Sequence, residues 1–233
     1  KSFFWMILFL IYFTSGCLQE NVGQELKLNV NLDSNNGTVV ESYSNGEHIS
    51  TTKVIINFDF SETTATQKII TYGIDPMDGR PPININANSN SNINVEFSKH
   101  GIHLINAYAV DELNNMKNMT ISIRIELRID WVQSDTFEPE PLIFNPIPDN
   151  GGKNPSLIEI YSVVENPYLI ENIGGGGQSV EFTWNLADEQ NDVCQKKSEK
   201  VDDGEIATWK TIHFNTYEIH ELRIIYDDGQ DQI

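Results

Sequence analysis

Apolar and polar residues alternate along much of the chain, a two-residue period typical of β-strands with one buried face. Residues 121–129 give the clearest example, because their Ile and Leu side chains alternate with Ser, Arg and Glu. Turn-forming pairs such as Asn45-Gly46 and Asp78-Gly79 separate segments of this kind. The pattern predicts seven strands, at residues 26–32, 54–60, 68–74, 83–87, 93–97, 103–109 and 121–129.

Seven short strands with this spacing predict an all-β fold, an immunoglobulin-like antiparallel sandwich over residues 25–131. The same alternation predicts which side chains face inward. They are Val54, Ile56, Phe58, His103, Ile105, Ala107, Ile123 and Ile125.

Part of this region resembles the PKD domain family. Residues 97–111 contain a Gly that opens a strand of alternating apolar residues (Gly101) and an Asp that closes it (Asp111), with a turn at Asn115 before the last strand. Residues 72–79, which end in Asp-Gly, are similar to the family's Trp-Asp-Phe-Gly-Asp-Gly segment. The resemblance implies an extracellular spacer or binding module without catalytic residues of its own.

The second half has a different composition. Residues 132–156 are rich in Pro and acidic side chains, which predicts a semi-rigid linker. Residues 157–233 predict a second, smaller β domain, and whether it continues past Ile233 is open. Its strands are expected at 157–164, 178–186, 205–214 and 217–226.

The first residues predict the location of the protein. An apolar run at residues 3–13 is followed by small residues and then by Cys17, the order of a secretory signal. Residues 14–17 also resemble the lipobox of prokaryotic lipoproteins, which implies cleavage after residue 16, a lipid on Cys17 and a tether at 17–24. An ordinary cleaved signal and an uncleaved anchor are the alternatives. Each places the chain outside the cytoplasm, and we expect a membrane-anchored, cell-surface protein.

The charge excludes one class of partner. A formal net charge of -19 and a pI of about 4.4 repel phosphate backbones, so we expect no nucleic-acid binding. Residues 132–233 hold six basic and twenty acidic side chains, and the acidity is therefore concentrated in the second half.

Two acidic groups are candidate calcium ligands. Asp227, Asp228 and Asp231 crowd together after the last expected strand, as in oxygen-rich calcium loops. The alternative is a solvated acidic rim. A weaker second set consists of Asp75, Asp78 and Asp111.

Histidine and cysteine give a weaker signal. His213 and His220 flank a tight turn and can approach each other across a hairpin. A pair of histidines without a third ligand, however, usually has only a structural role in its strands. Cys194 has polar neighbours and is expected in a loop, either buried, paired beyond Ile233, or paired with an unmodified Cys17. We therefore expect no zinc site.

Two functional hypotheses follow. The first is a non-enzymatic surface protein, in which a PKD-like spacer or adhesion module presents the acidic domain to a protein or polysaccharide. The alternative is a carbohydrate- or peptide-binding module whose ligand face includes Trp209 and Tyr217 beside Trp184 and Tyr226, or an accessory region of a larger secreted hydrolase. Trp184 can equally be the anchor of a buried core. No hydrolase motif of the Gly-x-Ser-x-Gly or His-Glu-x-x-His type occurs.

Overall fold

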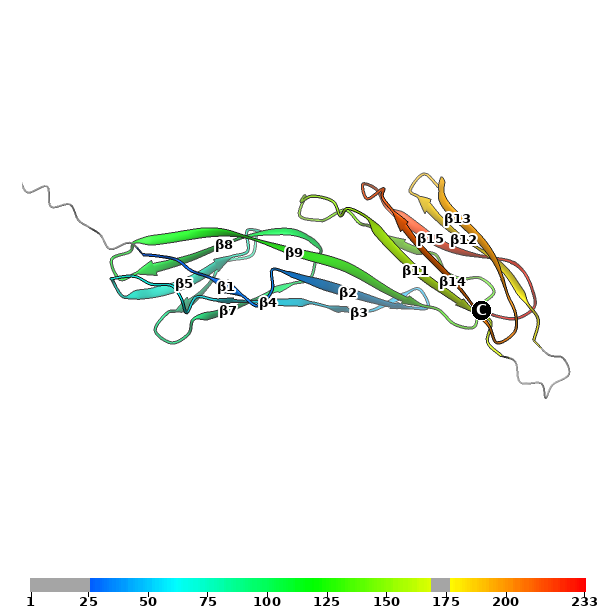
Figure 1. Ribbon diagram of the computed structural model, residues 1–233, viewed down its shortest axis with the longest axis horizontal. Coiled ribbons are helices and arrows are strands. Elements are labelled where there is room, and N and C mark those ends of the chain that lie inside the picture. Colours follow the sequence, from blue (N-terminus) through cyan, green and yellow to red (C-terminus); the bar gives the residue numbers. More distant parts are fainter. Residues whose placement is uncertain (1–25, 169–176) are drawn as a thin grey trace, which may run out of the picture.

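The computed structural model describes residues 26–168 and 177–233, and their regular structure consists of β-strands. Two groups of strands lie end to end along the long axis of the molecule (Figure 1). We call β1–β9 the first sandwich and β10–β15 the second sandwich. Within the described residues, no helix has the length and apolar character required to cross a membrane.

The first sandwich contains two sheets, with three strands in the order β1-β4-β7 and six in the order β3-β2-β9-β8-β5-β6. Their apolar faces enclose a core that includes Phe58, Phe60, Ile74, Ile105 and Ile123. The strands are β1 (Asn31–Leu32), β2 (Asn36–Ser44), β3 (Glu47–Thr52), β4 (Val54–Asp59), β5 (Ile69–Asp75), β6 (Ile83–Asn86), β7 (Asn92–Phe97), β8 (Gly101–Asp111) and β9 (Met116–Val132).

The all-β sandwich is as predicted, but its topology differs from the expected one in two ways. Residues 36–52, whose polar sequence did not indicate strands, form the β2–β3 hairpin around Asn45 and Gly46, both at positive φ. β2 pairs in parallel with β9, so the six-stranded sheet is mixed rather than purely antiparallel. Of the eight predicted inward-facing residues, Val54 is half-buried and the other seven are buried.

The second sandwich packs a four-stranded sheet, in the order β10-β15-β12-β13, against the β11–β14 pair. Trp184 is fully buried at its centre, where its indole N–H donates to Ser162 Oγ across the core at 2.8 Å and its ring contacts Trp209. The strands are β10 (Leu142–Phe144), β11 (Ile158–Glu165), β12 (Val180–Asp188), β13 (Val193–Val201), β14 (Ile206–His213) and β15 (His220–Asp228).

Two of these strands were not predicted. β10 lies in the Pro-rich stretch and is only three residues long, too short for a periodic signal. β13 has a mainly polar sequence, as expected for a strand whose side chains are mostly exposed or half-buried. Cys194 belongs to this strand, so the prediction that it lies in a loop is wrong.

Residues 133–157 between β9 and β11, which include β10 and which we call the connecting segment, form bonds to the other strands and loops of both sandwiches. On one side, Asn150 Nδ2 donates to the carbonyl of Ile102 at 2.9 Å and His100 Nε2 lies 3.1 Å from the carbonyl of Pro146. On the other side, Thr136 and Ile233 form two backbone hydrogen bonds of 3.0 Å. β10 also pairs with β15. These bonds restrain the two sandwiches relative to each other.

We expect Trp184→Ala to lower the free energy of unfolding by about 3–5 kcal/mol, because it empties the centre of the second core. The control is Tyr217→Ala, at a side chain 76% exposed, which should change stability by no more than about 0.5 kcal/mol. Urea denaturation of the full chain measures both. Equal effects would contradict this assignment of the core.

Gly73 provides a test of the first sandwich. The Tyr108 ring lies across Gly73, and its hydroxyl donates a hydrogen bond to Asn84 Oδ1 at 2.7 Å. A Cβ at residue 73 would therefore overlap the ring. We expect Gly73→Ala to cost about 1–3 kcal/mol by overpacking. The cost should fall in a Tyr108→Ala background, and an unchanged cost in a double-mutant cycle would show that the ring is not the cause.

Candidate metal centre

Each of the acidic residues proposed as calcium ligands accepts a hydrogen bond from a different part of the chain. Asp227 accepts a hydrogen bond from Thr183 Oγ1 at 2.6 Å, and Asp228 accepts the N–H of Gly229 at 2.9 Å. Asp231 is buried and accepts the backbone N–H of Gln178. The three do not form a group of converging ligand atoms. Calcium at these residues therefore gains no support from their geometry.

The residues of the second acidic set, Asp75, Asp78 and Asp111, bond to residues in their own turns. Asp75 accepts the N–H of Met77, Asp78 pairs with Arg80, and Asp111 accepts hydrogen bonds from Leu113 and Asn115. Hydrogen bonds from Asn115, with the two backbone donors, lower the pKa of Asp111, and those from Arg80 lower the pKa of Asp78. These carboxylates stabilise turns, and they do not converge on one point.

The structure does not form the expected aromatic face. Trp184 is fully buried and Trp209 is 7% exposed, so neither indole presents a ring to solvent. Tyr217 is exposed in the loop before β15, and Tyr226 is half-buried with its hydroxyl donating to the carbonyl of Asp231. The prediction of a ligand face at Trp209 and Tyr217 is wrong because Trp209 is needed by the core.

A different group of side chains does converge. Cys194, His213 and His220 offer ligand atoms that all lie within 4.8 Å of one another. Among the residues that the structure describes, this is the only group of three or more Cys, His, Asp or Glu side chains that could hold a metal ion. The expectation that the two histidines lack a third ligand is therefore wrong.

Three strands bring these residues to one end of the second sandwich. Cys194 is the extra residue of a β-bulge, because Ala187 pairs with Val193 and Leu186 pairs with Gln195. A bulge redirects the side chain that it carries. His213 ends β14 and His220 begins β15, so the turn between them brings the imidazoles together, with ring centroids 4.8 Å apart.

Hydrogen bonding fixes the orientation of His220. Its Nε2 lies 2.9 Å from the carbonyl of Asn215, which makes Nε2 the protonated donor and leaves the lone pair on Nδ1. That Nδ1 is buried and has no hydrogen-bond partner. The loop is held by Thr216, whose hydroxyl donates to the carbonyl of Pro155 at 2.8 Å and whose own carbonyl accepts from Asn154.

His213 has the complementary free nitrogen. Its Nε2 is also buried without a hydrogen-bond partner. Burial lowers the pKa of His213 and the neighbouring His220 lowers it further, whereas Glu218 opposes the shift. The ring is therefore neutral near pH 7 and keeps a lone pair for binding.

The thiol of Cys194 is protonated in the absence of an ion. Partial desolvation raises its pKa, and the carboxylates of Asp188, Glu218 and Asp192 raise it further. The same negative charges favour a cation at this position, and a bound metal ion would reverse the balance by deprotonating the thiol. The site therefore combines one sulfur and two imidazole nitrogens in acidic surroundings.

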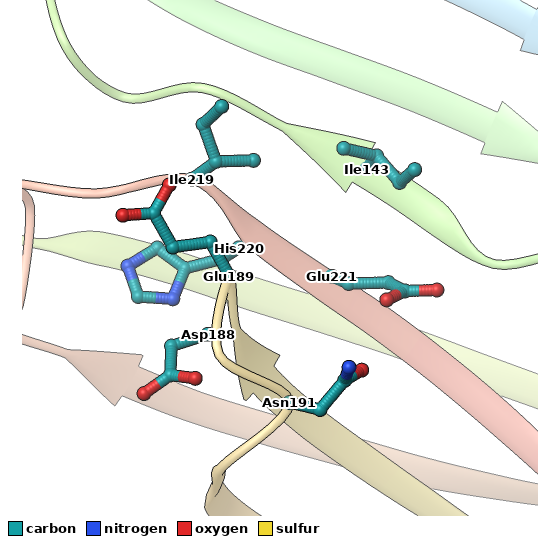
Figure 2. A pocket seen from close by; sticks show the side chains of 7 residues that line it. All are labelled: Ile143, Asp188, Glu189, Asn191, Ile219, His220 and Glu221. Carbon is teal, nitrogen blue, oxygen red and sulfur yellow. The ribbon is translucent and has the colours of Figure 1, made fainter.

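A pocket adjoins the site at His220. It is lined by Ile143, Ile219, Asp188, Glu189, Asn191, His220 and Glu221. In Figure 2 the side chains of Asp188 and Glu189 lie near the imidazole, and that of Glu221 extends away from it. Three carboxylates therefore lie in the pocket beside the site, and the exposed member of the site itself is Cys194.

The sequence contains a signal for the third ligand. Strands β13 and β14 lie in opposite sheets and are joined by the turn at residues 202–205, and Gln195 Nε2 donates across to the carbonyl of Ile212 at 2.9 Å, beside Cys194 and His213. The loop at residues 214–219 then returns the chain to the sheet of β13, where β15 begins at His220. The signal is visible only if β13 is recognised as a strand, which its polar composition prevented.

Comparisons with known proteins give little further information. No protein-family model and no curated protein matches the chain. Among solved structures, a carbohydrate-binding module of the β-sandwich superfamily aligns with 90% of this chain and 94% of its own, at 10% identity and a TM-score of 0.37. A β-glucuronidase of Bacteroides uniformis aligns with 87% of this chain at 9% identity and a TM-score of 0.29, and this chain spans only 28% of that enzyme. These scores describe a coarse likeness between β-sandwich chains, and nothing about function follows from them.

We expect the Cys194 thiol to titrate above the usual range, measured as the pH dependence of its alkylation in a full chain carrying Cys17→Ser. Glu218→Gln should lower the midpoint, because it removes a negative charge that raises the thiol pKa. Glu181→Gln, an exposed position on β12, is the control and should leave it unchanged. A midpoint at or below that of a small thiol would contradict the prediction.

Proposed function

We propose that the chain is a non-enzymatic, membrane-anchored surface protein, in which a PKD-like first sandwich is a spacer and the acidic second sandwich faces a partner. The observation that carries this proposal is the connecting segment, which bonds to both sandwiches and keeps them end to end. A spacer has to resist folding back, and these bonds supply that resistance.

The position of the chain ends supports the same proposal. The described chain enters the first sandwich at the end that is far from the second sandwich (Figure 1). A lipid on Cys17, which lies outside the described residues, would therefore hold the first sandwich at the membrane and the second away from it. Two acyl chains are sufficient for stable attachment.

The charge distribution supports a role in contact for the second sandwich. Residues 132–233 carry six basic and twenty acidic side chains, a net charge of -14. Such a surface is repelled by anionic lipid headgroups and favours partners with basic surfaces. The charge therefore favours an orientation in which the second sandwich points away from the membrane.

Membrane attachment is tested by fatty-acid labelling of cells that express the full chain. We expect label and membrane retention in the parent and in Cys194→Ser, and loss of both in Cys17→Ser, because only Cys17 follows the signal. Protease added to intact cells should remove the second sandwich. Equal labelling of parent and Cys17→Ser, or protection from protease, would refute the proposal.

A further inference from the structure

We propose that Cys194, His213 and His220 bind one zinc-class transition-metal ion, through the thiolate sulfur, Nε2 of His213 and Nδ1 of His220. The ligand atoms of these side chains already lie within 4.8 Å of one another. This site is independent of the membrane anchor and of the spacer role.

The strongest argument is the state of the two imidazoles. Both free nitrogens are buried and lack a hydrogen-bond partner, and His220 is wholly inaccessible to solvent. Buried polar atoms are normally satisfied, and two such atoms on neighbouring imidazoles, in a group that also includes a thiol, require an explanation. A metal ion satisfies both, since neutral imidazole nitrogens are common metal ligands.

The environment of His220 matches that of a metal-binding histidine. Such residues generally donate their second ring N–H to a carbonyl or carboxylate, which fixes the tautomer and directs the other nitrogen to the metal. His220 does this through Nε2 and the carbonyl of Asn215 at 2.9 Å. The supporting hydrogen bond therefore exists before any ion binds.

The distances are compatible with binding after a small adjustment. Zinc bonds of about 2.0–2.3 Å in tetrahedral geometry place ligand atoms roughly 3.5 Å apart, so separations of up to 4.8 Å have to contract by no more than about 1.3 Å. Cys194 can supply this movement because it is exposed and lies at a bulge.

The donor set selects the class of ion. One sulfur and two nitrogens suit zinc and its relatives, whereas calcium and magnesium prefer oxygen ligands. The carboxylates of Asp188, Asp192 and Glu218, which act on the thiol, add attraction for a divalent cation. Three protein ligands leave a fourth position for water or for a group from a partner.

The test is titration of the full chain, carrying Cys17→Ser so that Cys194 is the only thiol, with Co²⁺ as a spectroscopic substitute for zinc. We expect one equivalent to bind with a thiolate-to-cobalt charge-transfer band and tetrahedral visible absorption. Zn²⁺ should abolish the spectrum stoichiometrically, and excess Ca²⁺ should not.

Variants decide which residues bind. Cys194→Ser should abolish the charge-transfer band. Because Cys194 is exposed, the variant should keep its fold, which circular dichroism checks. His213→Gln should weaken Co²⁺ binding at least about tenfold. The control His48→Gln, at an exposed histidine of the first sandwich, should bind as the parent does.

A parent chain without the charge-transfer band overturns the proposal. Binding that survives both Cys194→Ser and His213→Gln also overturns it, because the ion would then be held elsewhere. Neither result affects the assignment of the membrane anchor, which depends on Cys17.

Discussion

The burial of two apolar sheet faces against each other is the interaction on which each half of this molecule depends. In the first sandwich the faces meet at Phe58, Phe60 and Phe97, and in the second they meet at Trp184 and Trp209. These cores contain separate sets of residues, and each sandwich therefore has its own source of stability. The aromatic side chains with the largest area are used in the cores, which is why the second sandwich has no exposed tryptophan platform.

The sequence predicted the strands that place several side chains in these cores and missed strands that place one or none there. Alternation identified β4, β8 and β9 because one face of each is buried. It missed β3, in which every residue is exposed, and also β2 and β13, in which only Val39 and Val201 are buried. The pairing of such strands depends on hairpin geometry and on their position in the sheet, and hydrophobic alternation does not indicate either.

The metal centre was missed for the same reason. Its ligands come from the ends of three strands, and one of those strands has a polar sequence. The bulge that turns Cys194 toward the histidines is a property of register, which appears only when β12 and β13 are paired. The calcium prediction rested on proximity along the chain, whereas in the structure each of these carboxylates accepts a hydrogen bond from a different residue, Thr183, Gln178 or Gly229, so the geometry adds no support to it.

The parallel pairing of β2 with β9 determines how the first sandwich responds to tension. The chain enters the mixed sheet through β2 and leaves it through β9, and the two strands are in register from Asn36 opposite Arg124 to Ser44 opposite Val132. A force that pulls the two ends of the chain apart acts along these strands in opposite directions. It therefore shears all of their hydrogen bonds at once, rather than opening them one after another as in unzipping. A surface protein built in this way would hold its fold when a bound partner is drawn away from the cell.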